Sequence, residues 1–482
     1  MYRLNLIADP KKRKATMPKQ TDIKIRGVKI YFLPVQTRMP YRFGTEQLDS
    51  VTCVRVCVDV ENAQGNTASG WGETPLSAPW AWPEAHLTYA IRETAMKDFC
   101  IQLGKAWAVC DASGHPLEIG HTFQETILPN ELSAFNQTST TDPMPQLAAL
   151  VCSSAFDLAL HDAYGMANNV NIYDTYTNAY LNHDLSHYLE PADDVNFSFD
   201  GQYPADYIIN PRPNNLPAWH AVGGNDLLDD SERTGSEPDD NYPVVLADWI
   251  KADGLTCLKI KLTGQEPGWD YDRIVTIGEI GIKQGALWLC TDFNCTVQTV
   301  DYVNNILDRL MKDHPRIYQM ILYVEQPFAH DLEANLLDVH SISSQKPLFM
   351  DESAHDWRIV RLGRKLGWTG VALKTCKTQT GAILSLCWAR AHGMSLMVQD
   401  LTNPMLAQIP HVLLTAHAGT IMGMETNAMQ FYPDASLPEA AVHPGVYRRQ
   451  NGQLDISTLQ GPGFGYQLDQ IKRDLPEPAA TF

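Results

Sequence analysis

The segment LTCLKIKL, residues 255–262, places two lysines inside an otherwise apolar run. Its length and its content of Leu, Ile and Cys are typical of a buried β-strand, in which side chains alternate between two faces. Cys257, Lys259 and Lys261 then lie on one face and Leu258 on the other. An ammonium group in a protein interior is costly unless it is paired with a negative charge. The segment therefore predicts a buried strand with carboxylates close to both lysines.

Similar short apolar runs follow along the chain. They are ALWLCTDFN (286–294), ILYVEQPF (321–328), PLFMDES (347–353), GVALKTC (370–376), MSLMVQD (394–400) and GTIMGME (419–425). Their spacing, roughly 23 to 33 residues, suits a unit of one strand and one helix. Short continuous apolar strands are typical of a parallel sheet that is covered on both faces. With one further strand expected within residues 191–248, the pattern predicts an α/β fold, a (β/α)8 barrel.

The residues before the barrel predict a second, α+β domain over 23–165. Strand-like segments at 23–33, 51–60 and 68–73 precede helical patterns at 83–110 and 145–166, and strands followed by helices favour this class. We expect residues 111–144, which are polar and contain Pro, Gly, Ser and Thr, to form a loop.

Two further segments are expected to be irregular. Residues 1–22 are expected to be a disordered tail, in which PKKRK (10–14) fits a solvated basic run better than a nuclear localisation signal. Residues 171–243 are rich in Asn, Asp, Tyr and Pro and are expected to be an irregular insertion near the start of the barrel. Within it, residues 223–241 are expected to form a surface excursion.

Composition limits the class of protein. The 482 residues are 44% hydrophobic and 19% charged, as in a soluble globular protein, and contain no apolar run long enough to span a membrane. A net charge of −19 argues against binding to nucleic acid or to an anionic membrane. The ten cysteines form no CxxC pair and lie mostly among apolar neighbours, which predicts a reducing, cytoplasmic environment.

Polar residues stand near the carboxyl end of each predicted barrel strand, where barrel active sites are built. Three consecutive strands supply Asp292, Glu325 and Asp351, and lysines flank them on both sides. Three carboxylates without histidine or thiol make an oxygen site for a hard divalent cation, for which Mg²⁺ is the first choice and Mn²⁺ the alternative. A lysine beside such a cation can act as a base, and a metal can stabilise the charge that develops when a proton next to a carboxylate is removed.

The combined motifs resemble the enolase superfamily, in its mandelate racemase/muconate lactonizing enzyme family, and within it the muconate lactonizing enzyme-like subgroup. The resemblance rests on Lys-x-Lys (259–261), Asp-x-Asn (292–294), Glu-x-Pro (325–327), Asp-Glu-Ser (351–353) and the single Lys374, in this order. It implies a modified TIM barrel, (β/α)7β-like, over residues 166–430 and an α+β capping domain over 23–165. It also implies that residues 431–482 return to the cap.

The resemblance also implies a role for each site residue. Asp292, Glu325 and Asp351 would be metal ligands. Lys261 and Lys374 would be the acid/base pair, and Lys259 would bind the substrate carboxylate and lower the pKa of Lys261. Asn294 and Glu352 would support the ligands. Glu425 would either contact the substrate or form a helix cap or a core ion pair, and Arg42, in an expected loop of the cap, would lie close to the substrate.

Some residues admit more than one interpretation. Lys377 competes with Lys374, but Lys374 directly follows the apolar run, and we expect Lys377 to lie on the next turn. The seventh strand, LMVQDLTNP, lacks the His-x-Asp pair of mandelate racemase-like subgroups, so a histidine base is not expected. Glu425-x-Asn427 replaces the Asp-x-Asp of dipeptide epimerases, which argues against a dipeptide substrate. The segments 39–44 and 74–82 are expected to be aromatic cap loops that favour a partly apolar or ring-bearing acid.

The sequence thus predicts an enzyme that removes the α-proton of a small carboxylate through a metal-stabilised enediolate. Racemase, epimerase or cycloisomerase activity is the first expectation. Dehydration or syn-elimination of an acid-sugar or succinylbenzoate type of substrate is the alternative. A Schiff-base aldolase would not need three converging carboxylates, and a non-catalytic barrel would be expected to lack one of the key side chains. The family resemblance also implies a homo-oligomer.

Overall fold

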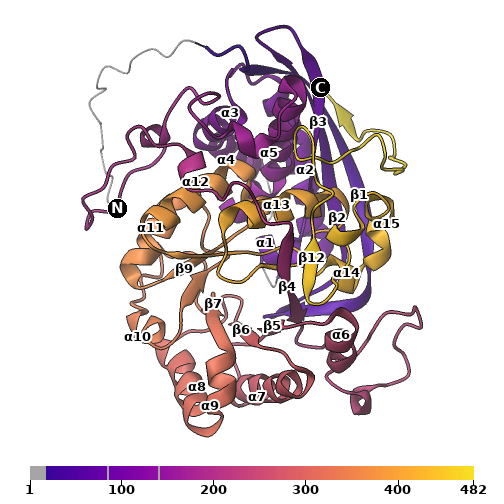
Figure 1. Cartoon of the computed structure of the whole chain (residues 1–482), viewed down its shortest axis with the longest axis vertical. Coiled ribbons are helices and arrows are strands. Elements are labelled where there is room, and N and C mark those ends of the chain that lie inside the picture. Colours follow the sequence, from indigo (N-terminus) through magenta and orange to yellow (C-terminus); the bar gives the residue numbers. More distant parts are fainter. Residues whose placement is uncertain (1–17, 84–85, 139–141) are drawn as a thin grey trace.

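Eight parallel strands form a closed barrel in the computed structural model, which describes residues 18–83, 86–138 and 142–482 (Figure 1). Each strand pairs with the next, and the last pairs with the first, so that the sheet has no free edge. The fold class expected from the sequence is confirmed. The strands are β4 (Asn215–Val222), β5 (Cys257–Lys261), β6 (Trp288–Asp292), β7 (Ile321–Glu325), β8 (Leu348–Met350), β9 (Gly370–Leu373), β10 (Ser395–Val398) and β11 (Met424–Glu425).

Helices connect these strands and cover the outside of the barrel. They are α6 (Leu246–Asp253), α7 (Pro267–Gln284), α8 (Val300–Asp313), α9 (Pro315–Met320), α10 (His340–Ser343), α11 (Trp357–Leu366), α12 (Gln379–Ala391) and α13 (Gln408–Ala418). Shorter elements at the carboxyl side of the barrel are η6 (Thr375–Lys377), η7 (Met405–Ala407), α14 (Ala428–Phe431), η8 (Pro433–Ser436), α15 (Leu437–Ala440), η9 (Pro444–Val446) and β12 (Gln453–Asp455). No helix in the described ranges is both long enough and apolar enough to cross a membrane.

The inside of the barrel is filled by a cluster of large side chains. Trp219, Tyr323 and Phe349 pack there with Cys257, Cys290 and Met397. Because strand side chains alternate, the residue two positions further along each strand also faces inward, one layer nearer the carboxyl ends. This register places Lys259, Asp292, Glu325 and Asp351 directly above the apolar layer.

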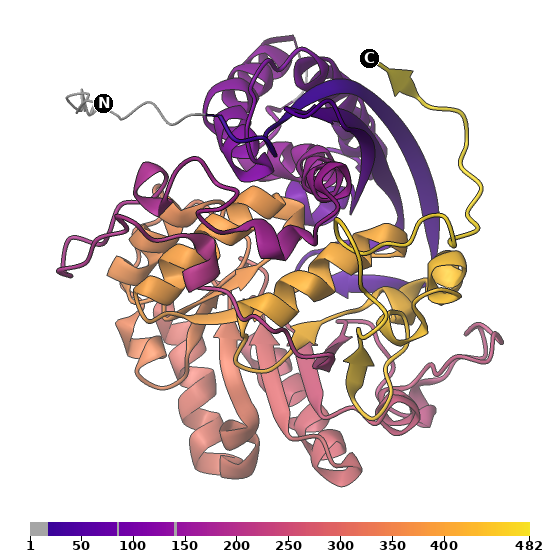
Figure 2. The same ribbon diagram turned by 45° about the horizontal axis from the view of Figure 1, so that its top comes forward.

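The N-terminal domain is an antiparallel sheet that packs against helices (Figure 2). Its strands are β1 (Ile23–Phe43), β2 (Glu46–Asn62) and β3 (Thr67–Pro75), with β13 (Ala480–Thr481) on the outer edge of β1. The short helix α1 (Ala78–Ala81) follows β3, and α2 (Tyr89–Ala108) and α5 (Gln146–Asn168) are the long helices. The helix α5 is buried along nearly its whole length and lies against β2 and β3.

The prediction of a loop over 111–144 is wrong. The segment forms α3 (Pro116–Thr122), one π-helical turn η1 (Phe123–Ile127) and α4 (Leu128–Thr138). Its start is capped locally, because the His115 ring accepts a hydrogen bond from the amide of Leu117 and Glu118 accepts one from the amide of His115. Phe123 and Leu128 are buried, so the segment has an apolar face that its polar composition concealed.

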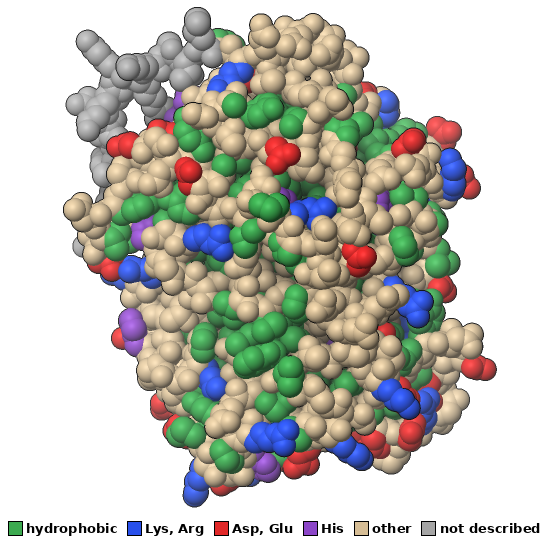
Figure 3. Space-filling model, viewed as in Figure 1, with side chains coloured by type: hydrophobic (Ala, Val, Ile, Leu, Met, Phe, Trp, Pro, Cys, Tyr) green, Lys and Arg blue, Asp and Glu red, His purple; other side chains and the backbone are tan. Residues whose placement is uncertain are grey.

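The segment 171–243 contains the first barrel strand, β4, which was expected somewhere within 191–248. The rest of it forms short turns, η2 (Ile172–Thr175), η3 (Leu185–His187), η4 (Pro204–Asp206) and η5 (Asp230–Glu232). Of the expected N-terminal tail, residues 1–17 with the PKKRK run lie outside the described residues. Asp22, by contrast, is buried and accepts hydrogen bonds from Asn182. On the face shown in Figure 3, basic and acidic side chains are interspersed.

Candidate active site

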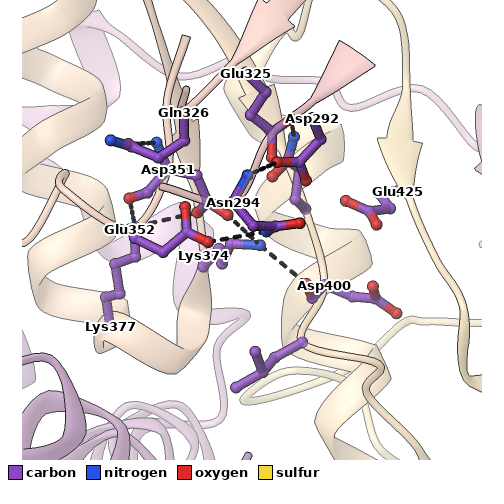
Figure 4. A network of polar contacts seen from close by, with 12 residues as sticks. Asp292, Asn294, Glu325, Gln326, Asp351, Glu352, Lys374, Lys377, Asp400 and Glu425 are labelled. Carbon is purple, nitrogen blue, oxygen red and sulfur yellow. Dashed lines mark hydrogen bonds and ion pairs between the residues drawn. The ribbon is translucent and has the colours of Figure 1, made fainter. Parts of the chain in front are cut away.

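The predicted site residues gather at the carboxyl ends of the barrel strands, with the exception of Arg42. Figure 4 shows most of them pointing toward one another from successive strands. Asp292 and Glu325 are the last residues of β6 and β7, Asp351 directly follows β8, and Lys374 directly follows β9. All four side chains are buried. Lys259, Lys261, Glu352 and Glu425 are buried beside them, and Asn294 is half-buried.

The two lysines of β5 are each paired with carboxylates. The Lys259 ammonium group donates to Glu325 Oε1 at 2.6 Å and to Glu425 Oε2 at 2.7 Å, and it lies 3.1 Å from Asp292 Oδ2. The Lys261 ammonium group donates to Asp292 Oδ2 at 2.5 Å. These contacts offset the cost of burying the two positive charges.

The charges in this cluster shift one another's pKa values. Burial alone would raise the pKa of Asp292, but the neighbouring ammonium groups of Lys259 and Lys261 hold it below its usual value. Burial and the neighbouring Lys259 ammonium group both act to lower the pKa of Lys261. Asp292 outweighs them, so the pKa of Lys261 lies above its usual value in this arrangement.

Lys374 and Lys377 both contact Asp351 from the end of β9. The Lys374 ammonium group lies 3.1 Å from Asp351 Oδ2 and donates to the carbonyl oxygen of Asp400 at 3.1 Å. The Lys377 ammonium group donates to the carbonyl oxygen of Asp351 and lies 3.4 Å from its Oδ1. Of the two lysines, Lys374 belongs to the lining of the cavity described below, and Lys377 does not.

Buried side-chain amides hold the carboxylates in place, and two of them, Gln326 and Gln399, were not singled out from the sequence. Gln326 accepts a hydrogen bond from the amide of Asp351 at 2.7 Å, and Gln399 donates to Glu325 Oε2. Asn427 donates to Glu425 Oε1 at 2.7 Å. Gln326 and Gln399 directly follow strand ends, so the strand-end pattern that indicated the carboxylates could also have indicated them.

The backbone is locally strained where these side chains leave the strands. Asn294, Cys295 and Gln326 have φ values of 44°, 65° and 29°, in the left-handed region that non-glycine residues seldom adopt. Strain of this kind persists where surrounding contacts fix the conformation, and it is concentrated at functional sites.

A small cavity of about 30 Å³ lies between the strand ends and the N-terminal domain. The barrel contributes Lys259, Lys261, Lys374 and Glu425 to its wall, among others. The N-terminal domain contributes Tyr41, Phe43, Ser77 and Trp80. The cavity has room for no more than a few water molecules, so it is too small for a substrate in this conformation.

The prediction that Arg42 lies close to the substrate does not fit this geometry. Residues 39–44 were expected to form a loop, but β1 continues to Phe43. Alternation along the strand therefore turns Tyr41 and Phe43 toward the cavity and Arg42 toward solvent. The Arg42 side chain is exposed and its guanidinium group lies 3.5 Å from Asn225 Oδ1.

The residues present fit a divalent cation by their chemistry. The cluster holds six buried carboxyl groups and four buried lysines, a formal excess of two negative charges when all are ionised. The carboxyl groups are those of Asp292, Glu325, Asp351, Glu352, Asp400 and Glu425, and the lysines are Lys259, Lys261, Lys374 and Lys377. Burial and nearby carboxylates raise the pKa of Glu325 to about 8 and that of Glu352 to about 7. Glu352 Oε2 and Asn294 Oδ1 are buried and have no hydrogen-bond partner among the described residues.

The lysines lie among the carboxylates in this structure. Accordingly, no three His, Cys, Asp or Glu side chains of the described residues surround a single point as ion ligands would. Small movements of side chains that already converge on one place would be needed to form a complete coordination shell.

Comparison with known proteins places the chain among barrel enzymes. Residues 244–472 match the family model described as enolase C-terminal domain-like. No curated protein matches the chain. Solved structures that share the fold include an N-succinyl Arg/Lys racemase from Bacillus cereus, with 16% identity and a TM-score of 0.59 over 95% of this chain and 99% of the other.

Two further structures are similar to the same extent. A dipeptide epimerase from Enterococcus faecalis, complexed with Mg and the dipeptide L-Leu-L-Tyr, has 17% identity and a TM-score of 0.58 over 92% of this chain and 99% of the other. A muconate lactonizing enzyme from Pseudomonas fluorescens, complexed with muconolactone, has 15% identity and a TM-score of 0.56 over 92% and 95%. At these identities the similarity establishes the shared fold.

Proposed function

Because the chain belongs to the mandelate racemase/muconate lactonizing enzyme family of the enolase superfamily, we propose that it is a divalent-cation-dependent isomerase. In this proposal it removes the α-proton of a small carboxylic acid and returns a proton to the same substrate. The observation that carries the proposal is the position of two lysines. Lys261 ends β5 and Lys374 follows β9, four strands apart in an eight-stranded ring, and both line one cavity.

The opposite positions of the two lysines favour proton transfer at both faces of one substrate carbon. A substrate held between the two strands presents one face of its α-carbon to Lys261 and the other to Lys374. The neutral amine of one lysine accepts the proton at Nζ, and the ammonium group of the other donates one at Nζ. This arrangement supports racemisation or epimerisation more directly than elimination, for which one lysine suffices.

Asp292, Glu325 and Asp351 would hold the cation, with Glu352 and Asn294 beside them. When bound, Mg²⁺ supplies positive charge that makes the proton next to a carboxylate more acidic. Lys259, which is tied to Glu325 and Glu425, would add a second positive charge beside the substrate carboxylate. The buried amides keep the carboxylates oriented, so less reorganisation is needed during the reaction.

Proton exchange tests this proposal. The protein is incubated in D₂O with Mg²⁺ and a pool of α-substituted carboxylic acids, and mass spectrometry measures deuterium uptake at the α-carbon. Uptake is expected to require Mg²⁺ and to be lost, or confined to one enantiomer, in Lys261→Ala and Lys374→Ala. Lys365→Ala, which removes an exposed lysine of α11, is the matched control and is expected to behave as the wild type.

Calorimetric titration with Mg²⁺ tests the cation site without a substrate. The wild type is expected to bind Mg²⁺, and Asp292→Asn is expected to bind it at least about tenfold more weakly, because one charged ligand is lost. A wild-type protein that binds no divalent cation would overturn the proposal. Uptake that persists in both lysine variants would overturn the assignment of the bases. Borohydride trapping of a substrate on the protein would indicate a Schiff-base reaction instead.

A further inference from the structure

Each of the two proposed acid/base lysines lies against an aromatic ring from the N-terminal domain. The ammonium nitrogen of Lys261 lies 5.8 Å from the centre of the Phe43 ring. The ammonium nitrogen of Lys374 lies 5.2 Å from the centre of the Trp80 ring. Both distances are within the range of a cation–π contact. The Trp80 ring also lies 5.7 Å from the Lys377 ammonium nitrogen.

The two rings come from separate segments, and packing fixes each of them. Phe43 ends β1 beside Tyr41, whose ring packs on Phe431 at 4.2 Å. The next residue, Gly44, has a φ of 51°, and a Cβ there would lie 3.2 Å from the Asn294 Cβ, so the tip of the β1–β2 hairpin sits directly on the site. Trp80 lies in α1, whose four residues are all buried.

An aromatic ring and a carboxylate act differently on a neighbouring lysine. The face of the ring attracts the ammonium group but cannot take its proton, and the bulk of the ring keeps water away. In this site the carboxylates approach each ammonium group from the barrel side, and the rings approach from the N-terminal domain. Lys261 and Lys374 are 6% and 4% exposed, so both residues are almost completely shielded from solvent. We call this shielding the seal.

We propose that Phe43 and Trp80 are positioning residues, one for each lysine, so that the N-terminal domain completes two half-sites independently. Phe43 holds Lys261 in place and excludes water from its ammonium group, and Trp80 does the same for Lys374. This inference rests on the proposed function in assigning proton transfer to these lysines. The seal itself can be measured without any substrate.

Site-resolved reductive methylation tests the seal. The folded protein is treated with formaldehyde and a borane reductant in the presence of Mg²⁺, and peptide mass spectrometry follows dimethylation at Lys261, Lys374 and the exposed reference Lys24. Both site lysines are expected to react slowly in the wild type. Phe43→Ala is expected to speed the reaction at Lys261 by about tenfold, and Trp80→Ala at Lys374 by about tenfold, each with little change at the other lysine.

Conservative variants distinguish the effect of the aromatic ring from the effect of its volume and from the effect of general unfolding. Trp80→Phe keeps a ring and is expected to protect Lys374 nearly as well as the wild type. Phe43→Leu keeps apolar volume without a ring, and Lys261 is expected to react faster than in the wild type. If either alanine variant exposes both lysines equally, or neither exposes its own, the two half-sites do not exist. Because methylation needs no turnover, this result stands whether or not proton exchange is found.

Discussion

Tyr41 lines the cavity, and its hydroxyl group makes no hydrogen bond to another described residue. Burial and the nearby Glu425 carboxylate raise the pKa of this phenol, so it remains a neutral donor. Tyr41→Phe is therefore expected to lower kcat/KM by about tenfold, the usual cost of one lost hydrogen bond to a charged group. The free energy of unfolding is expected to change by less than about 0.5 kcal/mol.

Steady-state kinetics on the acid identified by proton exchange measures this effect, with thermal unfolding as the check on stability. Arg42→Ala is the matched control, because its side chain lies on the opposite face of β1 and is exposed. Equal losses of activity in both variants would show that the end of β1 supports the fold of the site and that the Tyr41 hydroxyl group has no specific role.

A second residue-scale prediction concerns Asp162 on α5. Its carboxylate accepts hydrogen bonds from the amides of Trp71 at 2.9 Å and Phe464 at 3.0 Å, but burial raises its pKa from 3.8 to about 7. Between these two pH values the folded state holds a proton that the unfolded state has lost. The contribution to the free energy of unfolding is therefore fully present below about pH 4 and is lost as the pH rises through 7, by at most about 4 kcal/mol.

Denaturant unfolding of the wild type and Asp162→Asn at pH 5 and pH 8 measures this contribution. The variant loses one acceptor and is expected to be less stable at both pH values, so only the pH dependence is compared. The wild type is expected to lose more stability than the variant between the two values. Parallel pH dependences would show that Asp162 is ionised throughout.

At the scale of elements, the contact between β3 and α5 depends on the absence of a side chain. A Cβ at Gly72 would lie 2.1 Å from the carbonyl oxygen of Ala155 and 2.5 Å from the amide nitrogen of Ala159. Both atoms are backbone of α5, which cannot yield without moving the helix. Gly72→Ala is expected to lower the free energy of unfolding by about 3 kcal/mol or more.

Chemical denaturation monitors this change, with Gly268→Ala as the matched control. Gly268 lies in the first turn of α7, and nothing lies within 4 Å of a Cβ placed there. The control is expected to be neutral or slightly stabilising, by less than about 1 kcal/mol. Comparable losses in both variants would mean that the close approach of β3 to α5 is not what limits the substitution.

The elements also differ in how far the sequence could predict them. The barrel strands were predictable because each short apolar run ends in a polar residue, and β5 with its two lysines is the clearest case. Strand β4, NLPAWHAV, lacks such a marker and lies among irregular residues, so only its presence was expected. The helix α4 was missed because its exposed polar side chains outnumber the one residue that it buries. The helix α3 buries four of its seven residues, but it is too short to show a helical period in the sequence.

The sequence could predict only the part of the site geometry that the barrel strands contribute. The strand period relates Lys259, Asp292 and Glu325 to one interior layer, and this relation can be worked out from the sequence. The approach of Tyr41, Phe43 and Trp80 depends on how far β1 extends and on how the two domains pack. No local pattern encodes either property. The same limit explains why Arg42 was wrongly expected close to the substrate. It lies between Tyr41 and Phe43 in the sequence, but its side chain faces away from the cavity.

At the scale of the whole molecule, a buried ionic cluster joins the N-terminal sheet to the segment after the barrel. Arg55 on β2 pairs with Glu73 on β3, and its Nη2 lies 3.3 Å from Glu439 Oε1 on α15. Arg473 donates to both oxygens of Glu439 at 2.6 Å. The four charges balance, and Glu73 and Glu439 are fully enclosed. Such a cluster tolerates loss of one charge poorly, since the opposite charge is left buried and unpaired.

Glu439→Gln is therefore expected to lower the free energy of unfolding by about 3–5 kcal/mol, because two guanidinium groups then share the single carboxylate of Glu73. Adding Arg473→Met restores the balance between Arg55 and Glu73, so the double variant is expected to be more stable than Glu439→Gln alone. Denaturant unfolding of the wild type, both single variants and the double variant gives the coupling energy. A double variant no more stable than Glu439→Gln would show that the geometry of Glu439, rather than the balance of charge, joins the two parts of the molecule.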